Sequence, residues 1–321
     1  GAGPGVEVVW VPYIESAELR SAKGRHGGHD PTGLPTPVLD AQSLDSLARA
    51  HAIVGMDLPE PIADLAPNLR WFQGITAGHD HIDTAGLAAH GVVHTGASGI
   101  ASASIAEFVM ARVLEVWKHL RQIEAQQARR EWHVLFGRQL EGTTMGIVGL
   151  GSIGREVARR ARAFGVRVVA TRGSAKPGDV DADVDELRPA AEVDELLPTC
   201  DVLVLALPAD EASVDFLDAR RMELMKPGAV LVNVARGVHV VEADLIDALE
   251  RNHLGAAILD VTREEPLPPD DPLWSAPNLY LSPHSAVSLD RYEASIVALA
   301  AENLRAFLAE APMRNVVHDP R

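Results

Sequence analysis

The chain has little cysteine and few aromatic residues: Cys200 is the single cysteine among 321 residues, and aromatic residues make up 4%. One cysteine excludes a disulfide framework within the chain and a cysteine-based metal site. Because Cys200 precedes an apolar run, we expect it to be an inert buried thiol. No stretch approaches the roughly 20 apolar residues of a membrane-spanning helix. A basic, apolar signal segment is also missing at the start, so we expect a cytoplasmic protein.

Positive charge is scarce as well. The chain has 29 Lys and Arg against 45 Asp and Glu, which gives a formal net charge of −16. A phosphate backbone is bound by clustered Lys and Arg, so sequence-independent nucleic-acid binding is not expected. The loop from Gly24 to Pro37 carries His26, His29 and Asp30. A third or fourth convincing ligand is missing there, so we expect a solvated loop and no metal.

The strongest motif lies between Met145 and Arg172. An apolar run from Met145 ends in three glycines spaced as G-x-G-x-x-G, and an amphipathic segment follows. Such glycines allow a tight turn, close approach of a pyrophosphate, and close packing of helix on strand. A glycine turn alone also occurs for packing reasons, but strand, turn, helix and second strand together favour a dinucleotide site at Gly149, Gly151, Ser152, Ile153 and Gly154.

The second strand, Val166–Ala170, is followed by Thr171, Arg172, Gly173 and Ser174. Sites for NAD place an Asp or Glu here to bind the ribose hydroxyls, and that acid is missing. Arg172 would attract a 2′-phosphate. We therefore predict that NADP(H) is preferred over NAD(H), with Thr171, Arg172 and Ser174 at the ribose end and Lys176 as a further candidate. The alternative is that Arg172 is a solvated residue at a strand end.

Alternating apolar and amphipathic segments predict parallel α/β sheets. Further strands are expected at Val6–Ile14, Ala52–Met56, Leu69–Ile75, Val92–Thr95, Val202–Leu207, Ala229–Val234, Ala256–Leu259 and Leu279–Leu281. Helices are expected from Asp40 to about His51, from Asp83 or Thr84 to Gly91, from a capping box at Ser104–Glu107 to about Ala128, and over Leu289–Leu308.

Three other segments carry expectations. The acidic stretch Asp179–Glu195 is expected to be a solvated loop with a short helix. The tail Arg314–Val317 is expected to return to the first domain. Trp132 is expected in an interface or near the mouth of the active site, with core packing equally open.

Polar residues follow three of the later strands: Arg236, Glu265 and His284. Ligands of open α/β sheets bind at the carboxyl ends of strands, so these three should converge. A guanidinium can hold the carboxylate and keto oxygen of a 2-keto acid. An imidazole can protonate that oxygen, and a carboxylate beside it favours the protonated ring. Each residue alone also has an ordinary explanation as a surface ion pair, a loop residue or a cap.

These motifs together resemble the D-isomer-specific 2-hydroxyacid dehydrogenases over essentially the whole chain: the glycine turn, Val-Ala-Arg236-Gly, Leu-Asp-Val leading to Glu265-Pro266, and Ser-Pro-His284. The resemblance implies two doubly wound parallel-sheet domains in an α/β fold. A Rossmann cofactor domain, residues 100–286, would be inserted into a flavodoxin-like substrate domain, residues 1–99 and 287–321. It also implies a cleft that closes on binding, and a homodimer.

The resemblance further implies roles for single residues. Arg236, Glu265 and His284 become the catalytic set, and Asp260 a contact of the nicotinamide carboxamide. The loop Thr76–His79, with Ala77, Gly78 and His79, would bind the substrate carboxylate together with Arg236 and His284. Other dinucleotide contacts would be Leu207, Pro208, Val234, Ala235 and Ser285. Arg172 places the chain beside glyoxylate or hydroxypyruvate reductase-like members.

The chain departs from the family pattern at two places. His79 stands where a small apolar residue is common, and Ala209-Asp210 replaces a usual Leu-Thr. The leading hypothesis is an NADPH-dependent 2-keto acid reductase that forms the D-hydroxy acid. The alternative is a dinucleotide-sensing, corepressor-like binding protein of the same fold. A formate dehydrogenase is disfavoured, since that chemistry needs no proton-donating His–Glu pair.

Overall fold

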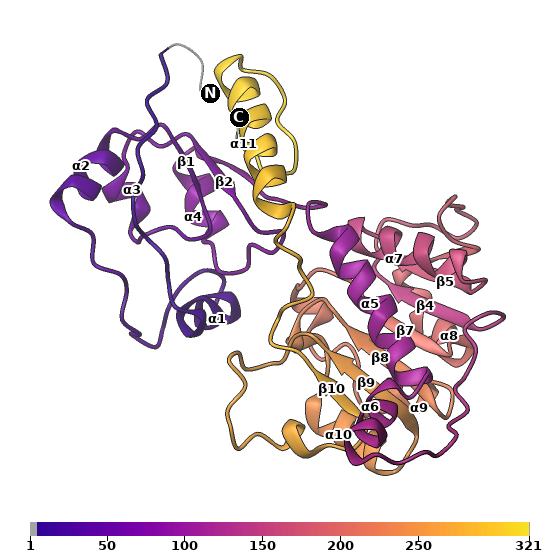
Figure 1. Cartoon of the computed structure of the whole chain (residues 1–321). Coiled ribbons are helices and arrows are strands. Elements are labelled where there is room, and N and C mark those ends of the chain that lie inside the picture. The colour runs from indigo at the N-terminus through magenta and orange to yellow at the C-terminus, as the bar shows by residue number, and fades with distance from the viewer. Residues whose placement is uncertain (1–4, 321) are drawn as a thin grey trace. The chain divides into compact units, whose positions relative to one another are not determined.

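The computed structural model describes residues 5–320, which form two compact units (Figure 1). Unit 1 contains the described residues up to Ile100 together with those from Leu289 onward, and unit 2 is Ala101–Ser288. The chain thus leaves unit 1, completes unit 2 and returns to unit 1. Within the described range, no helix combines the length and apolar character needed to cross a membrane.

Unit 1 is built on a four-stranded sheet in the order β1-β2-β3-β11. The strands β1 (Ala52–Gly55), β2 (Trp71–Gly74) and β3 (Val93–Thr95) are parallel, and β11 (Val316–His318) pairs antiparallel with β3. The return of the tail to this unit is therefore confirmed. The helices of unit 1 are α1 (Ala17–Arg25), α2 (Ala41–Arg49), α3 (Ile62–Leu65), α4 (Thr84–Ala89) and α11 (Tyr292–Leu308).

Local sequence explains how two of these helices begin. The carboxylate of Asp40 accepts the N–H of Ser43, and the carboxylate of Asp83 accepts the N–H of Gly86 at 2.7 Å. Both are N-caps, which satisfy a backbone donor that the helix itself leaves unpaired. The sequence predicted the first cap at Asp40 and the second at Asp83 or Thr84, and the structure shows Asp83.

Neighbouring residues of β2 point to opposite faces of the sheet, as the pleat requires. Trp71 packs on α11, where its ring centroid lies 5.5 Å from that of Phe307. Phe72 belongs to another cluster, with Leu47 of α2 and Leu87 of α4. Helices therefore cover both faces of the sheet, and the predicted α/β class is confirmed for unit 1.

The strand expected at Val6–Ile14 is wrong, because the structure leaves this segment without regular pairing. Val8 is 79% exposed and Trp10 is 87% exposed. Strand propensity reflects packing of β-branched and aromatic side chains against neighbours. Unit 1 supplies no such neighbours here, so the apolar pattern has no sheet to join. The helix α1 that follows was not expected.

Unit 2 is built on a seven-stranded sheet in which every pair is parallel. Its order, β10-β9-β8-β7-β4-β5-β6, is that of a Rossmann sheet with one added edge strand. The order reverses between β4 and β7, which is where such folds bind their ligands. The strands are β4 (Thr144–Val148), β5 (Arg167–Arg172), β6 (Glu186–Pro189), β7 (Val202–Leu205), β8 (Ala229–Asn233), β9 (Leu254–Leu259) and β10 (Leu279–Leu281).

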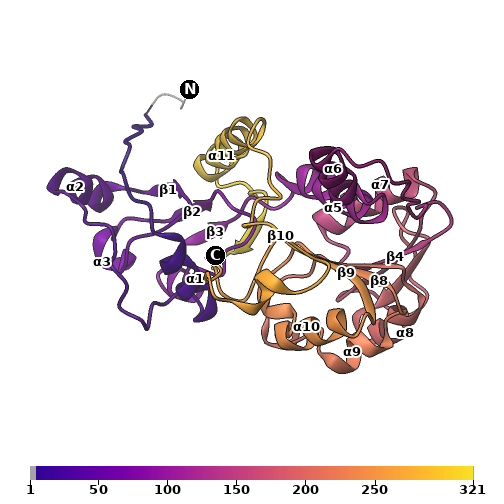
Figure 2. The ribbon, with the colours of Figure 1, turned by 60° about the horizontal axis from the view of Figure 1, so that its bottom comes forward.

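Helices cover both faces of this sheet (Figure 2). One face carries α5 (Ser102–Trp117), α6 (Leu120–Arg129) and α7 (Ser152–Ala163). The other carries α8 (Val193–Leu196), α9 (Ala219–Leu224) and α10 (Glu242–Glu250). Short 3₁₀ turns lie at Ala190–Glu192, Leu197–Thr199, Glu211–Ser213, Gly237–His239 and Pro272–Ser275.

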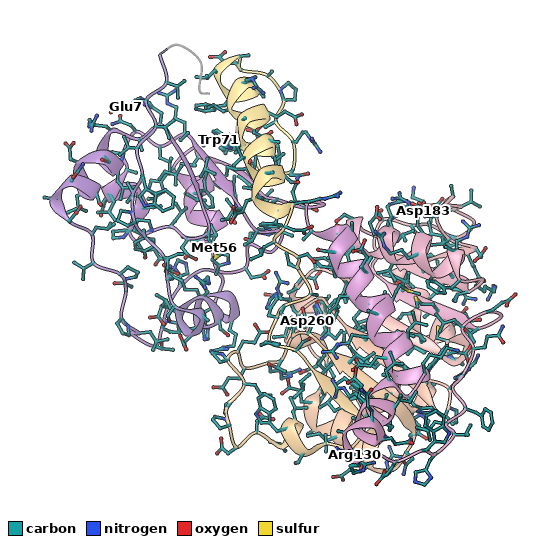
Figure 3. All side chains as sticks on the ribbon, viewed as in Figure 1. Glu7, Met56, Trp71, Arg130, Asp183 and Asp260 are labelled. Atoms are coloured by element: carbon teal, nitrogen blue, oxygen red, sulfur yellow. The ribbon has the colours of Figure 1, made fainter. Side chains whose placement is uncertain are left out.

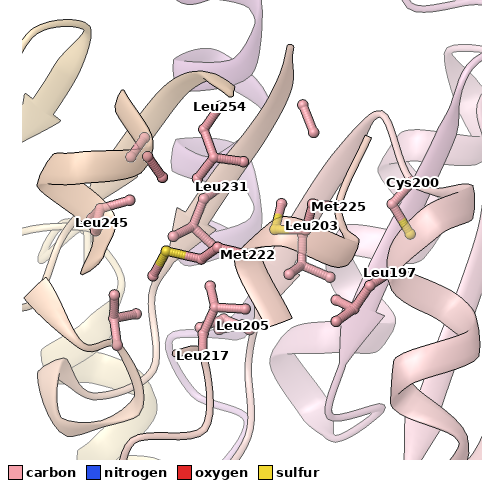
Figure 4. Packing of buried hydrophobic residues seen from close by; sticks show 14 of the residues in the cluster. Leu197, Cys200, Leu203, Leu205, Leu217, Met222, Met225, Leu231, Leu245 and Leu254 are labelled. Atoms are coloured by element: carbon pink, nitrogen blue, oxygen red, sulfur yellow. The ribbon is translucent and has the colours of Figure 1, made fainter. Parts of the chain in front are cut away.

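The core of unit 2 is aliphatic. Leu203, Leu205 and Leu231 are fully buried beside Met222 and Leu245 (Figure 4). Full burial of a side chain of this size contributes about 1.5–3 kcal/mol. Cys200 lies in the same cluster as a free, buried thiol, and burial raises its pKa to about 11. An inert thiol at this position is what the sequence led us to expect.

Two expectations for unit 2 are wrong. The capping box at Ser104–Glu107 does not form, because α5 already begins at Ser102 and the hydroxyl of Ser104 donates to the carbonyl of Ala101. The helix also does not run unbroken to Ala128, since His119 adopts a left-handed conformation between α5 and α6.

The acidic stretch Asp179–Glu195 is more ordered than expected. It contains the edge strand β6, which pairs with β5. Its carboxylates bind arginines of unit 2, so it is not only a solvated surface.

Candidate active site

Arg236, Glu265 and His284 lie together at the carboxyl end of the sheet of unit 2. They follow β8, β9 and β10 respectively, and these strands are adjacent. His284 Nδ1 lies 2.9 Å from Glu265 Oε2. The structure thus brings together the three residues that the sequence proposed as a catalytic set.

The turn after β8 places Arg236. The buried side chain of Asn233 donates from Nδ2 to the carbonyl of Arg236 at 2.9 Å, and its Oδ1 accepts the N–H of Ala235 at 3.0 Å. A Cβ at Gly237 would lie 2.0 Å from the carbonyl carbon of Thr262. Only glycine therefore lets this turn approach the loop that carries Glu265. Sequence reasoning missed Asn233, although an Asn ending an apolar strand was a visible signal.

Glu265 is held as a carboxylate. Its Oε1 accepts the N–H of Thr262 at 3.1 Å. Burial disfavours the charged form, but hydrogen bonds from His284 and Thr262 and the positive charges of His284 and Arg236 outweigh it, so the pKa of Glu265 is lowered. Glu265 is therefore ionised at neutral pH, and it can orient the imidazole ring.

Asp260 organises the loop that carries His284. This carboxylate is 3% exposed and accepts the hydroxyl of Ser282 at 2.6 Å and the N–H groups of Ser285 and Ala286. The carbonyl of Asp260 accepts the N–H of His284 at 2.8 Å. Figure 3 labels Asp260 within unit 2. Its predicted contact with a nicotinamide stays a prediction; its role in the loop was not foreseen.

His284 combines an unusual backbone conformation with an accessible side chain. Its backbone is left-handed, with a φ of 50°, and its side chain remains half-exposed. The Nδ1 atom faces Glu265, while the rest of the ring is accessible to solvent. This arrangement suits a residue that exchanges a proton with a ligand.

The glycine turn after β4 fits a dinucleotide. A Cβ at Gly149, whose φ is +101°, would lie 2.5 Å from the carbonyl oxygen of Ala206, and one at Gly154 would lie 2.2 Å from that of Gly149. A Cβ at Gly151 would meet nothing within 4 Å. The first and third glycines therefore serve packing, and the second leaves open backbone. Gly151 is also the N-cap of α7 without a side-chain cap, so the helix end, including Ser152 and Ile153, can face a pyrophosphate.

The residues predicted to face the ribose of the cofactor lie at and after the end of β5. The buried Thr171 accepts the N–H groups of Gly149 and Leu150 through its carbonyl. Arg172 forms an ion pair with Asp181, with 3.3 Å between Nη1 and Oδ2. Ser174 and Lys176 lie exposed in the segment that follows. The sequence had not foreseen a carboxylate partner for Arg172.

The loop after β7 contains Leu207, Pro208 and the unusual Ala209-Asp210 pair. Asp210 caps a short 3₁₀ turn, and its N–H donates to Ser213 Oγ at 2.8 Å. The buried His239 reaches this loop, with Nδ1 2.9 Å from the carbonyl of Ser213. Burial lowers the pKa of His239, so the ring is neutral and structural. Val234 and Ala235, predicted as cofactor contacts, are buried beside the turn that carries Arg236.

The loop Thr76–His79 belongs to unit 1. The hydroxyl of Thr76 donates to the carbonyl of Gly78 at 2.7 Å, and Ala77 is exposed. The ring of His79 meets the buried ring of His94 edge-on, with 5.5 Å between centroids. Burial, followed by the neighbouring histidines, lowers the pKa of His94 to about 4. His79 therefore packs on a neutral ring, and its predicted place in a substrate site stays a prediction.

Two further predictions from the sequence concern the surroundings of Trp132 and the binding of a metal ion. Trp132 is 94% exposed, which makes core packing wrong, while its predicted place in an interface or near the mouth of the active site stays a prediction. Across residues 5–320, no group of three or more His, Cys, Asp or Glu side chains is placed to hold a metal ion.

Comparison with known proteins identifies the family. The family model described as "D-isomer specific 2-hydroxyacid dehydrogenase, NAD binding domain" matches residues 110–286, more than half of the chain. A glyoxylate reductase of Korarchaeum cryptofilum is 33% identical over 277 residues, which cover 82% of this chain and 81% of that protein.

Two solved structures show the same likeness. A D-isomer specific 2-hydroxyacid dehydrogenase family protein from Aeromonas salmonicida superposes with a TM-score of 0.76 at 30% identity, covering 87% of this chain and 88% of the other. A probable 2-hydroxyacid dehydrogenase from Rhizobium etli, in complex with NADP, HEPES and L(+)-tartaric acid, gives 0.74 at 26% identity, covering 85% and 86%. The chain therefore belongs to the D-isomer specific 2-hydroxyacid dehydrogenase family, whose members are NAD(P)-dependent oxidoreductases.

Proposed function

We propose that this protein reduces small 2-keto acids to D-2-hydroxy acids with NADP(H), and catalyses the reverse oxidation. The observation that carries the proposal is the His284–Glu265 pair, 2.9 Å apart, beside Arg236 at the carboxyl ends of adjacent strands. The likeness to a glyoxylate reductase supports a small 2-keto acid as substrate. A bound nicotinamide supplies the hydride.

Arg236 binds and orients the substrate. Its guanidinium offers several donors in one plane, which can hold the carboxylate and the keto oxygen of the same molecule. Polarisation of the keto group makes its carbon a better hydride acceptor. The hydrogen bonds of Asn233 and the tight packing at Gly237 keep the backbone of Arg236 in place.

His284 moves the proton. With Nδ1 donating to the carboxylate of Glu265, the doubly protonated ring can give up the proton on Nε2 to the keto oxygen. The carboxylate of Glu265 keeps the ring oriented during this transfer. In the reverse direction the same Nε2 accepts the proton of the hydroxyl group.

The cofactor preference rests on the end of β5. An acidic residue that would bind ribose hydroxyls is missing there, and Arg172 stands in that segment with Ser174 close by in the chain. The Rhizobium etli relative, in complex with NADP, supports use of the phosphorylated cofactor in the family.

The protein is further proposed to act as a homodimer. An exposed apolar segment combines residues of α6 with those of the irregular chain that follows it: Leu120, Ile123, Trp132, Val134, Leu135 and Phe136. Trp132 is 94% and Phe136 is 89% exposed in the single chain. Soluble monomers rarely leave such a concentration of apolar side chains uncovered. A second copy of the chain is the partner that the family resemblance implies.

His284→Ala should lower kcat for reduction of glyoxylate or hydroxypyruvate by roughly 10²- to 10⁴-fold, because the proton donor is lost. The Kd for NADPH, measured by fluorescence titration, should stay within about 2-fold of the wild-type value. His90→Ala, on the surface of unit 1, is the matched control. Unchanged turnover in His284→Ala would refute this mechanism, and cofactor binding without turnover in the wild type would favour a binding protein.

Glu265→Gln should remove from the pH profile of keto-acid reduction the acid limb that reflects protonation of Glu265. Because the pKa of Glu265 is lowered, its charge persists throughout the neutral range and is lost only as the pH falls through that lowered value. The amide does not titrate, so the loss of activity at this low pH should be missing from the variant. Glu264→Gln, at an exposed neighbouring position, should leave the profile in place. A Glu265→Gln limb that coincides with wild type contradicts the pairing.

Arg172→Gln should weaken NADPH binding by roughly 10- to 100-fold, as expected for loss of a charge-assisted hydrogen bond to phosphate. NADH binding should change little, so the ratio of the two Kd values reports the effect. Arg167→Gln removes an exposed arginine from the opposite end of β5, where it pairs with Glu186, and serves as control. Equal weakening of both cofactors would count against a 2′-phosphate contact.

The double variant Trp132→Ser/Phe136→Ser should shift the mass measured by light scattering after size exclusion from twice 34.3 kDa toward 34.3 kDa. The reason is the loss of two large apolar contacts from the proposed interface. Val180→Ser, at a site that is 91% exposed elsewhere on unit 2, is the control. A wild-type protein that is monomeric at all concentrations rules out this interface.

A further inference from the structure

Five charged side chains meet at the ribose end of the dinucleotide turn. Three are arginines, Arg155 and Arg159 of α7 and Arg172 of β5, and two are aspartates of the loop after β5, Asp181 and Asp183. Figure 3 labels Asp183 on unit 2. The loop thus brings two carboxylates to the arginine that the proposed function assigns to a 2′-phosphate.

Asp181 is the carboxylate that contacts this arginine. Its Oδ2 accepts Arg155 Nη2 at 2.7 Å and Arg172 Nη1 at 3.3 Å, and its Oδ1 accepts Arg155 Nη1 at 2.8 Å. The side chain of Asp181 is 11% exposed, so water screens these pairs weakly. The hydrogen bond from Arg155, chief among the causes, lowers the pKa of Asp181 and keeps it ionised at neutral pH.

Asp183 has different partners. It accepts Arg155 Nη1 at 2.8 Å, and Arg159 Nε and Nη2 at 2.9 and 3.1 Å. Asp181 and Asp183 therefore share Arg155, while the ion pair with Arg172 is made by Asp181. The two neighbouring carboxylates therefore differ in their second partner, which is Arg172 for Asp181 and Arg159 for Asp183.

We propose that Asp181 is a specificity-determining residue that occupies Arg172 in place of a 2′-phosphate and so limits the preference for NADP(H). A dinucleotide without the phosphate leaves the ion pair intact. A 2′-phosphate must share Arg172 with Asp181, whose negative charge repels it, or displace that carboxylate. The proposal rests on the proposed function, since it assumes that Arg172 faces the ribose.

The ion pair between Asp181 and Arg172 explains why the presence of Arg172 does not by itself predict a strong preference for NADP(H). The acid that NAD-binding folds place at the end of this strand is missing from β5, but the carboxylate of Asp181, nine residues after Arg172 in the chain, contacts the Arg172 side chain. Its charge offsets that of Arg172, and Arg155 holds it there through two hydrogen bonds. With both Arg172 and Asp181 present, the net charge of the proposed ribose pocket is intermediate between that of a purely acidic and that of a purely basic pocket.

The test measures ligand binding by the full chain, by calorimetry, with adenosine 2′,5′-bisphosphate and adenosine 5′-monophosphate as probes. Asp181→Asn keeps the shape of the side chain and removes its charge. It should tighten binding of the bisphosphate roughly 3- to 10-fold and leave the monophosphate within about 2-fold. Asp181→Glu keeps the charge and should retain a ratio near that of wild type.

Asp183→Asn is the matched control, because it removes an equal charge from the same loop without touching Arg172. It should leave the ratio of the two affinities within about 2-fold of wild type. An equal change for both probes in Asp181→Asn, or no change, overturns the proposal. An effect of Asp183→Asn as large as that of Asp181→Asn also overturns it, because a general charge effect would then suffice.

Arg172→Gln separates this proposal from the proposed function. If Arg172→Gln leaves binding of the bisphosphate unchanged, the assignment of Arg172 to the 2′-phosphate fails, and the role of Asp181 fails with it. If Arg172→Gln weakens that binding but Asp181→Asn has no effect, the role of Asp181 alone fails. In the double variant the gain from Asp181→Asn should disappear, since the two side chains act through one contact.

Discussion

Parallel pairing of β7, β8, β9 and β10 is the constraint on which the site depends. In a parallel sheet the carboxyl ends of all strands lie at one edge, so residues that follow separate strands become neighbours. Arg236, Glu265 and His284 are tens of residues apart in the chain, yet the adjacent strands bring them to one place. The apolar core beneath them holds that edge in register, and the three side chains lie in the loops that follow the strands.

Buried polar side chains convert this coarse arrangement into a defined geometry. Asn233 fixes the turn that carries Arg236, and Asp260 fixes the loop that carries His284. Both are almost fully buried, and a buried polar group without partners would cost about 1–3 kcal/mol. Their hydrogen bonds therefore stabilise one loop conformation over others. Glu265 is held in a similar way, because its Oε1 accepts the N–H of Thr262 while its Oε2 contacts His284 Nδ1 and orients that ring.

The glycine turn and the end of β5 are organised by different interactions, close packing in the first and an ion pair in the second. The glycines of the turn are shaped by close contacts, and they suit any dinucleotide. The end of β5 differs from the glycine turn, because Arg172 forms an ion pair with Asp181 there. The sequence around Arg172 predicts a basic pocket, whereas the folded chain places the carboxylate of Asp181 beside this arginine. Such an ion pair forms only when two loops lie close together in the fold, so a local sequence motif does not predict it.

The sequence by itself determined the α/β fold, the glycine turn and the three residues after β8, β9 and β10, because apolar periodicity and strand-end position are local properties. The strand predicted at Val6–Ile14 does not form, because its apolar side chains have no sheet to pack against. The helix predicted to run unbroken from Ser104 to Ala128 is interrupted at His119, which adopts a left-handed conformation. The partners of Asn233, Asp260 and Arg172 were decided only by the tertiary structure. Hydrogen bonds and ion pairs between distant segments depend on distances that no local pattern records.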